Sequence, residues 1–368
     1  MKLLWFFILV VAFYKPVLAQ NVKWYQPKFA EGICEADPVN IFHRLPARLE
    51  DSVRKPVWDL SLNTAGEFIH FKTSASKITV RYTLSSNNFS MPHMPATGVS
   101  GLDLFALDRN DKWNWAPGRY HFGDTCSYVF ENLNLARGNN GVSDFYLYLP
   151  LYNSVTWLSI GVNEKEFFAF ADRKKEKPVV AYGTSILQGG VASRPGLAWT
   201  NILERMLHTT VINLGFSGNG RFEKPIFDLM AKVDAKLYIL DCMPNLTKGY
   251  GISDQEIKNR VIYGINKLRE KNPSVPILFA EHAVGYAPFY MDTARLNEYH
   301  NSSLLMERLF NSLKASGVKN IYLLTEKEIG FDINSTTEGL HPNDIGMMKY
   351  AIAYAKKIRE IFHENVGE

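Results

Sequence analysis

A serine follows a short apolar segment in the stretch Pro178-Val-Val-Ala-Tyr-Gly-Thr-Ser-Ile186. The β-branched run predicts a strand, and Gly183-Thr184 predicts a tight turn that presents Ser185 at the carboxyl end of that strand. An alcohol is a poor nucleophile near neutral pH until a neighbouring base removes its proton. Ser185 is therefore a candidate nucleophile only if the chain supplies a base, and a lone serine after a strand is otherwise typical of a capped turn.

A histidine near the far end of the chain is the candidate base. The segment Glu338-Gly-Leu-His341-Pro342 precedes the last helical pattern, where Pro342 suits the first helical position and biases His341 toward an extended conformation. Glu338 can accept the Nδ1 hydrogen of His341, fix its tautomer and stabilise the imidazolium. Ser185, His341 and Glu338 would then be nucleophile, general acid/base and orienting acid, which is a machinery for acyl transfer.

Two further segments end strands with hydrogen-bond donors. The loop Asn213–Gly220 has glycines that let main-chain N–H groups face a ligand, and Asn245 follows the next strand with a side-chain amide. A tetrahedral acyl intermediate carries an oxyanion that needs such donors. Ser217 is a rival nucleophile, but its glycine-rich surroundings fit an oxyanion loop better. Glu281-His282 ends a fourth strand and either contacts substrate or forms a buried edge pair, and the second alternative is favoured.

The elements that must position these residues form two halves. After residue 176, strand candidates at 179–182, 210–214, 237–240, 277–280 and 321–324 alternate with helical patterns. Ser253 and Glu256 form a capping box before one of these helices. Such alternation predicts a parallel sheet with helices on both faces, whose ligands lie beyond the carboxyl ends of the strands.

The first half has a different pattern. Apolar and polar residues alternate at 78–84 and 145–149, and residues 155–160 add another β-rich run. Turn-rich pieces separate these runs. This pattern predicts an antiparallel, jelly-roll-like β-sandwich. We therefore expect a sandwich domain over 20–175 and a catalytic domain over 176–368.

Taken in order, Gly183-Thr-Ser185, the loop Asn213–Gly220, Asn245 and His341-Pro342 resemble the four blocks of the SGNH (GDSL-like) hydrolase superfamily. Gly101-Leu-Asp-Leu-Phe105 resembles the Gly-x-Asp-Leu-Tyr stretch of the β-sandwich domain that precedes the hydrolase domain in a bacterial subgroup. The resemblance implies a flavodoxin-like sheet in the second half.

The resemblance also implies roles for individual residues. Ser185 would be the nucleophile and His341 the general acid/base, and the oxyanion hole would combine the N–H groups of Ser185 and Gly218 with Asn245. The chain departs from the family pattern at two places. Glu338 stands where Asp is usual, and the stretch from Asp241 to Asn245 replaces the usual Gly-x-Asn-Asp.

Composition excludes several classes of partner. The chain has 368 residues, of which 46% are hydrophobic, and its net charge of +4 comes from interspersed residues with no basic block. We therefore expect no nucleic-acid partner. The histidines are dispersed and no pair has metal-ligand spacing, so we expect no metal and no cofactor.

Cys34 and Cys126 lie in loop-like contexts and their pairing is left open, whereas Cys242 is expected to be buried.

The first residues are typical of an export signal. Lys2, an apolar run and the small residues before Gln20 predict a signal peptide over 1–19 that is cleaved after Ala19. The mature chain is then expected in the periplasm or outside the cell. Gln20 stands where a lipid-anchored protein needs cysteine, so no membrane anchor is expected after cleavage.

These observations favour a secreted serine esterase that removes small acyl groups from carbohydrate, above all O-acetyl groups. Trp113 and Trp115 lie in a turn-rich segment of the aromatic-rich first half and are either a sugar platform or buried packing residues. A GDSL-type lipase or thioesterase is the nearest alternative. A carbohydrate-binding protein with a decayed site is a second alternative, which the intact Ser185, His341 and Asn245 disfavour. An α/β-hydrolase is disfavoured because no Gly-x-Ser-x-Gly is complete. The oligomeric state is left open.

Overall fold

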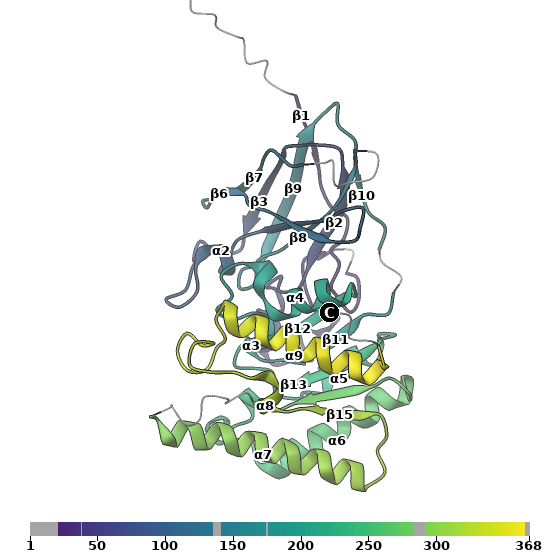
Figure 1. The fold of residues 1–368 in the computed structure, drawn as a ribbon, viewed down its shortest axis with the longest axis vertical. Helices are drawn as coiled ribbons and strands as arrows, with labels where there is room; N and C mark the ends of the chain where they lie inside the picture. Colours follow the sequence, from purple (N-terminus) through teal and green to yellow (C-terminus); the bar gives the residue numbers. More distant parts are fainter. Residues whose placement is uncertain (1–20, 38, 135–140, 174–175, 283–290, 365–368) are drawn as a thin grey trace, which may run out of the picture.

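The computed structural model describes residues 21–37, 39–134, 141–173, 176–282 and 291–364 (Figure 1). Within these residues, two five-stranded antiparallel sheets lie in the first half of the chain, and one five-stranded parallel sheet lies in the second half. Figure 1 shows the sandwich at one end of the molecule and α7 at the other. The predicted fold class is confirmed for both halves.

The sandwich pairs strands that are distant in sequence. Its sheets have the orders β1-β9-β3-β7-β6 and β10-β2-β8-β4-β5. The alternation read in the sequence places Ile78, Val80 and Tyr82 of β3 in the core between the sheets. The strands are β1 (Val22–Tyr25), β2 (Phe68–Thr73), β3 (Ile78–Leu84), β4 (Asp103–Leu107), β5 (Trp113–Ala116), β6 (Arg119–His121), β7 (Cys126–Phe130), β8 (Ser143–Tyr148), β9 (Val155–Asn163) and β10 (Phe168–Phe170).

The parallel sheet has the order β12-β11-β13-β14-β15, which is the flavodoxin-like order 2-1-3-4-5. Each strand begins and ends within one residue of its predicted bounds. The strands are β11 (Val179–Gly183), β12 (Val211–Gly215), β13 (Leu237–Asp241), β14 (Ile277–Ala280) and β15 (Ile321–Leu324). Val179 and Ala181 pack on one face of the sheet, and Val180 and Tyr182 pack on the other. The strands are continuous apolar runs because helices cover both faces.

The helices of this half are α3 (Ser185–Gln188), α4 (Trp199–Leu207), α5 (Lys224–Met230), α6 (Asp254–Lys271), α7 (Thr293–Ala315), α8 (Glu326–Ile329) and α9 (Asp344–Phe362). Residues of α4 and α9 form the core on one face of the sheet, and residues of α5, α6 and α7 form the core on the other. Within the described ranges, no helix is long and apolar enough to cross a bilayer.

Two predicted helix starts have different outcomes. The Ser253 side chain accepts a hydrogen bond from the Glu256 N–H, 3.2 Å away, so α6 begins where the sequence predicts. The prediction that Pro342 is the first residue of the last helix is wrong, because α9 begins at Asp344. The Asn343 side chain accepts hydrogen bonds from two N–H groups of the first turn and so acts as the N-cap.

The first half also contains short helical segments that the sequence analysis does not predict, namely η1 (Ala47–Leu49), α1 (Lys55–Ser61) and α2 (Ala96–Val99). Leu49 and Val57 are buried in the core of the parallel-sheet half. Arg44 is 1% exposed and donates to the main-chain oxygens of Asn63 and Gly215, each 2.7 Å away. These contacts join the two halves beneath the loop that follows β12.

Asp103, in the stretch that resembles Gly-x-Asp-Leu-Tyr, lies between the two halves. Its carboxylate pairs with Arg194, accepts from the Gly196 N–H at 2.8 Å, and accepts from Trp115 Nε1 at 2.6 Å. Asp103 is 3% exposed. The motif residue therefore joins β4 to the segment that precedes α4.

All three cysteines are free, so the pairing of Cys34 with Cys126 that the sequence leaves open is not formed. Cys126 lies in the core of the sandwich, whereas Cys34 packs against the parallel-sheet half. Burial, with a smaller contribution from the charge of Glu35, raises the pKa of the Cys34 thiol to about 12. Cys242 is buried, as predicted.

Candidate active site

Ser185, His341 and Glu338 meet at the carboxyl edge of the parallel sheet. Ser185 Oγ lies 2.7 Å from His341 Nε2, and His341 Nδ1 lies 2.7 Å from Glu338 Oε1. Ser185 directly follows β11, and the other two residues lie in the loop before α9. A hydroxyl, an imidazole and a carboxylate in this chain of contacts can activate the hydroxyl by general-base catalysis.

A tight strand-to-helix turn presents Ser185. Thr184 is the N-cap of α3 and accepts from the Ile186 N–H at 3.4 Å. A Cβ on Gly190, two residues after α3, would lie 2.9 Å from the Tyr152 hydroxyl, 3.0 Å from the Ser185 main-chain oxygen and 3.3 Å from His341 Cδ2, so a side chain there would push these neighbours away. Glycine at position 190 therefore lets the imidazole approach the nucleophile closely, a requirement that the sequence analysis misses.

The loop before α9 folds back so that Glu338 reaches His341. Glu338 Oε1 accepts from the His341 N–H at 2.6 Å as well as from Nδ1. Thr336 Oγ1 accepts from the Gly339 N–H at 2.9 Å and donates to the His341 carbonyl at 3.0 Å. These bonds tighten the turn, and the longer glutamate side chain therefore contacts the imidazole in place of the usual aspartate.

The charge of Glu338 is stabilised by its partner. Partial burial disfavours the carboxylate, but hydrogen bonds from the side chain and backbone of His341 outweigh this effect and lower the pKa of Glu338. The ionised carboxylate then holds the hydrogen on His341 Nδ1 and leaves Nε2 free to accept the proton of Ser185.

The predicted oxyanion hole includes two main-chain N–H groups. Within the described ranges, neither the Ser185 N–H nor the Gly218 N–H is donated to a protein acceptor. Gly218 has a left-handed φ of 67°, and a Cβ there would meet nothing within 4 Å, so this part of the loop faces open space. The loop is held by Gln188 Oε1, which accepts from the Ser217 N–H at 3.0 Å.

Asn245 lies against the same loop. Its Oδ1 accepts from the Gly220 N–H at 3.2 Å, and its Nδ2 donates to the Tyr250 hydroxyl at 3.1 Å. The Arg221 guanidinium lies 4.7 Å from the centre of the Tyr250 ring and donates to the Gly218 carbonyl at 2.8 Å. This network fixes the amide of Asn245 against the loop that contains Gly218. Tyr250 and Arg221 are positioning groups that the sequence analysis misses.

Both halves of the chain match known families. Residues 176–359 match the GDSL-like lipase/acylhydrolase family. The chain belongs to this family. Residues 22–168 match the GxDLY domain, the N-terminus of SGNH-hydrolase-type esterases, so the predicted resemblance is confirmed for both halves. A comparison with curated proteins gives no match.

Several solved structures resemble this GDSL-family chain. A protein described as a GDSL-like lipase from Bacteroides ovatus is 29% identical, with 93% of this chain and 98% of that chain covered and a TM-score of 0.81. A salicylyl-acyltransferase from a tetracycline biosynthetic pathway is 16% identical, with the same coverage and a TM-score of 0.71. A family two carbohydrate esterase from Clostridium thermocellum is 12% identical, with 81% and 93% covered and a TM-score of 0.51. The last two likenesses show a shared fold.

Two residues of the sandwich half also reach the site, and the sequence analysis misses both. The Tyr152 hydroxyl donates to the Ser185 carbonyl at 3.2 Å. The His93 ring lies 6.1 Å from the His341 ring, measured between centroids. No local pattern links either residue to the catalytic segments, because each is brought there by packing between the halves.

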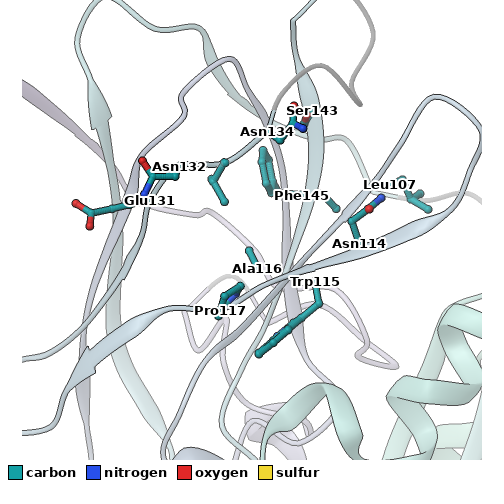
Figure 2. Close-up of a pocket in the computed structure, with 12 residues that line it drawn as sticks. Leu107, Asn114, Trp115, Ala116, Pro117, Glu131, Asn132, Asn134, Ser143 and Phe145 are labelled. Carbon is teal, nitrogen blue, oxygen red and sulfur yellow. The ribbon is translucent and has the colours of Figure 1, made fainter.

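Trp113 and Trp115 lie at the contact between the halves. Trp113 Nε1 donates to the Arg205 carbonyl on α4 at 3.0 Å. Trp115 donates to Asp103, and the Arg194 guanidinium lies 4.3 Å from the centre of its ring. Figure 2 shows Trp115 and Asn114 projecting from opposite sides of β5, and both line a pocket of about 310 Å³ in the sandwich half. These contacts favour the structural alternative for both indoles.

Glu281 also has a structural contact. Its side chain is buried, and its Oε2 accepts from the Glu326 N–H at 2.9 Å at the start of α8. His282 packs against Tyr299 with ring centroids 4.4 Å apart. The buried edge pair that the sequence analysis favours is therefore the arrangement that the structure shows. Among the described residues, no group of three His, Cys, Asp or Glu side chains is placed to hold a metal ion.

We expect Trp115→Ala to lower the free energy of unfolding by about 1–3 kcal/mol, because it removes a hydrogen bond to a buried carboxylate and a cation–π contact. It should change activity toward aryl acetate and acetylated oligosaccharide by the same factor. Chemical denaturation and steady-state kinetics measure the two effects. Trp157→Ala, which removes an indole that is 37% exposed on β9, is the control for activity and should leave the rates with both substrates unchanged. A raised KM for the oligosaccharide alone would instead identify Trp115 as a sugar platform.

Proposed function

We propose that this GDSL-family protein is an exported serine esterase that hydrolyses small acyl esters of carbohydrate, O-acetyl esters above all. The observation that carries the proposal is the chain of contacts from Ser185 Oγ through His341 to Glu338, with both distances at 2.7 Å. Export rests on residues 1–19, which lie outside the described residues.

In the proposed reaction, Ser185 Oγ attacks the ester carbonyl while His341 Nε2 takes its proton. The tetrahedral oxyanion is stabilised by the N–H groups of Ser185 and Gly218 and by the Asn245 amide. Collapse of the intermediate breaks the bond to the alcohol, and His341 returns the proton to that leaving oxygen. Water then attacks the acyl-enzyme with His341 again as base, which releases the acid and restores Ser185.

Two observations and one prediction support the substrate class. The chain belongs to a family of acylhydrolases, and its fold is shared with carbohydrate esterases. Ser185 is only 7% exposed, which suits a small acyl group better than a long one. The predicted export would place the enzyme with extracellular or periplasmic carbohydrate. Because the chain is similar to a protein described as a GDSL-like lipase, from Bacteroides ovatus, a long-chain ester is the alternative substrate that the experiment must test.

We expect kcat/KM to fall at least about ten-fold from nitrophenyl acetate to nitrophenyl octanoate, because added methylenes that do not fit a pocket each change transition-state binding by about 1–3 kcal/mol. The same enzyme should release acetate from acetylated oligosaccharides. Acetate is measured by a coupled assay, and Ser185→Ala is the blank. An octanoate optimum without acetate release from any carbohydrate would replace the proposal with the lipase alternative.

A further inference from the structure

A two-residue turn of the sandwich half lies beside the triad. The Met91 N–H donates to the Met94 carbonyl at 2.9 Å, and the Met94 N–H donates to the Met91 carbonyl at 3.1 Å. Pro92 and His93 therefore form the tip of a closed turn between β3 and β4. Proline fixes its own φ and suits the first central position of such a turn, so the backbone that carries His93 is restrained.

The catalytic half fixes the position of this turn. Met94 is 2% exposed and lies in the core that contains Ile186. Thr97 Oγ1 donates to the Ser193 carbonyl at 2.6 Å, and a Cβ on Gly98 would lie 2.2 Å from the Ala192 oxygen. The segment is thus packed closely on the residues that follow the nucleophile turn, and His93 has a defined place relative to Ser185.

The His93 side chain is exposed, although its neighbours in the turn are anchored. Its ring is tilted by 36° to the His341 ring at the 6.1 Å centroid separation, and it lies within electrostatic reach of Glu338. The turn is held by its backbone hydrogen bonds and by the buried Met94 side chain, and the His93 imidazole takes part in neither. An exposed polar ring beside the catalytic histidine is therefore available to a ligand.

The chemistry of the reaction says which part of the substrate lies there. His341 must protonate the leaving oxygen, so the alcohol half of the ester passes beside its ring. An imidazole can donate to a hydroxyl group or accept from one. We propose that His93 binds the alcohol half of the ester, a polyhydroxylated leaving group, and so makes the sandwich half a part of the active site that selects the alcohol. The inference rests on the proposed esterase function.

The test compares two esters that share the acetyl group and differ in the alcohol. For His93→Ala we expect kcat/KM toward an acetylated oligosaccharide to fall about 10- to 50-fold, mainly through KM, because a hydrogen bond between enzyme and substrate is lost. The kcat/KM of His93→Ala toward nitrophenyl acetate should fall less than about three-fold, because the leaving group of this ester has no neighbouring hydroxyl groups. His93→Gln should recover part of the loss because its amide keeps a donor and an acceptor.

His121→Ala is the matched control, since it removes an exposed imidazole from β6 in the same half. It should leave both activities unchanged. The proposal is overturned if His93→Ala affects both esters equally, which would indicate an effect on His341, or if it affects neither. If the wild-type enzyme releases no acetate from carbohydrate, the proposed function fails separately. The ratio of glycerol monoacetate to nitrophenyl acetate hydrolysis then still tests whether His93 recognises the alcohol, because the alcohol half of the monoacetate keeps its free hydroxyl groups.

Discussion

Ser185→Ala is expected to lower kcat for ester hydrolysis by at least about 10³-fold, because no other hydroxyl replaces the nucleophile and only transition-state binding by the oxyanion donors remains. The fold should persist. Ser185 lies at the first position of the short helix α3, where alanine is tolerated, and its Oγ contacts His341. The thermal midpoint should therefore stay close to that of the wild type while turnover of nitrophenyl acetate disappears.

Ser217→Ala is the matched comparison for this loss. The Ser217 main chain, which donates to Gln188, is retained by the substitution, so a much smaller loss of activity is expected. A serine-directed phosphonate should label the wild-type enzyme on the peptide that contains Ser185. Retained turnover in Ser185→Ala, together with inactivation of Ser217→Ala, would assign the nucleophile to Ser217.

The nucleophile is accessible to sequence reasoning because its signals are local. Val179–Gly183 is a continuous apolar strand, and the turn that presents Ser185 follows it directly. Parallel strands end at one edge, so Asn245 and the loop at Gly218 could be expected near Ser185 once the strands were recognised. Glu338 and His341 are three residues apart and meet within one turn of the chain. In each case a short segment and the sheet edge suffice.

Four of the residues that sequence reasoning misses depend on contacts between the halves. Arg44 and Met94 come from the sandwich half and are buried against the catalytic half. Tyr152 and His93 reach the triad through the same packing. A single sequence holds no local periodicity for such contacts, because they form only after both cores have folded.

The two tryptophans show a second limit. Trp113 and Trp115 lie two residues apart on β5 and so share a face. The sequence analysis places them in a turn-rich segment and does not say whether they meet solvent or the other half. Trp115 is 49% exposed and yet donates to a buried carboxylate, so an exposed side chain can still have a structural contact. The function of an aromatic residue at a domain contact follows from its partners, which the sequence pattern does not contain.

Glu338→Gln is expected to lower kcat by about 10²–10⁴-fold, with His341→Ala at least as severe. Glutamine removes the charge that stabilises the imidazolium, and its amide can donate to Nδ1 and so favour the tautomer with hydrogen on Nε2, which cannot accept the proton of Ser185. Glu338→Asp is the matched control, because it keeps the charge and shortens the side chain by one methylene. Its kcat should lie between those of Glu338→Gln and the wild type, because the turn is built around glutamate.

The double variant decides whether the two residues act together. Members of a triad act as a unit, so Glu338→Gln combined with His341→Ala should be little worse than the worse single variant. The rates are measured with nitrophenyl acetate, and circular dichroism checks that each variant is folded. Multiplicative losses would show that Glu338 contributes independently of His341. The 2.7 Å contact between Glu338 and His341 Nδ1 would then not orient the base. In that case another residue serves as the orienting acid, or the site has none.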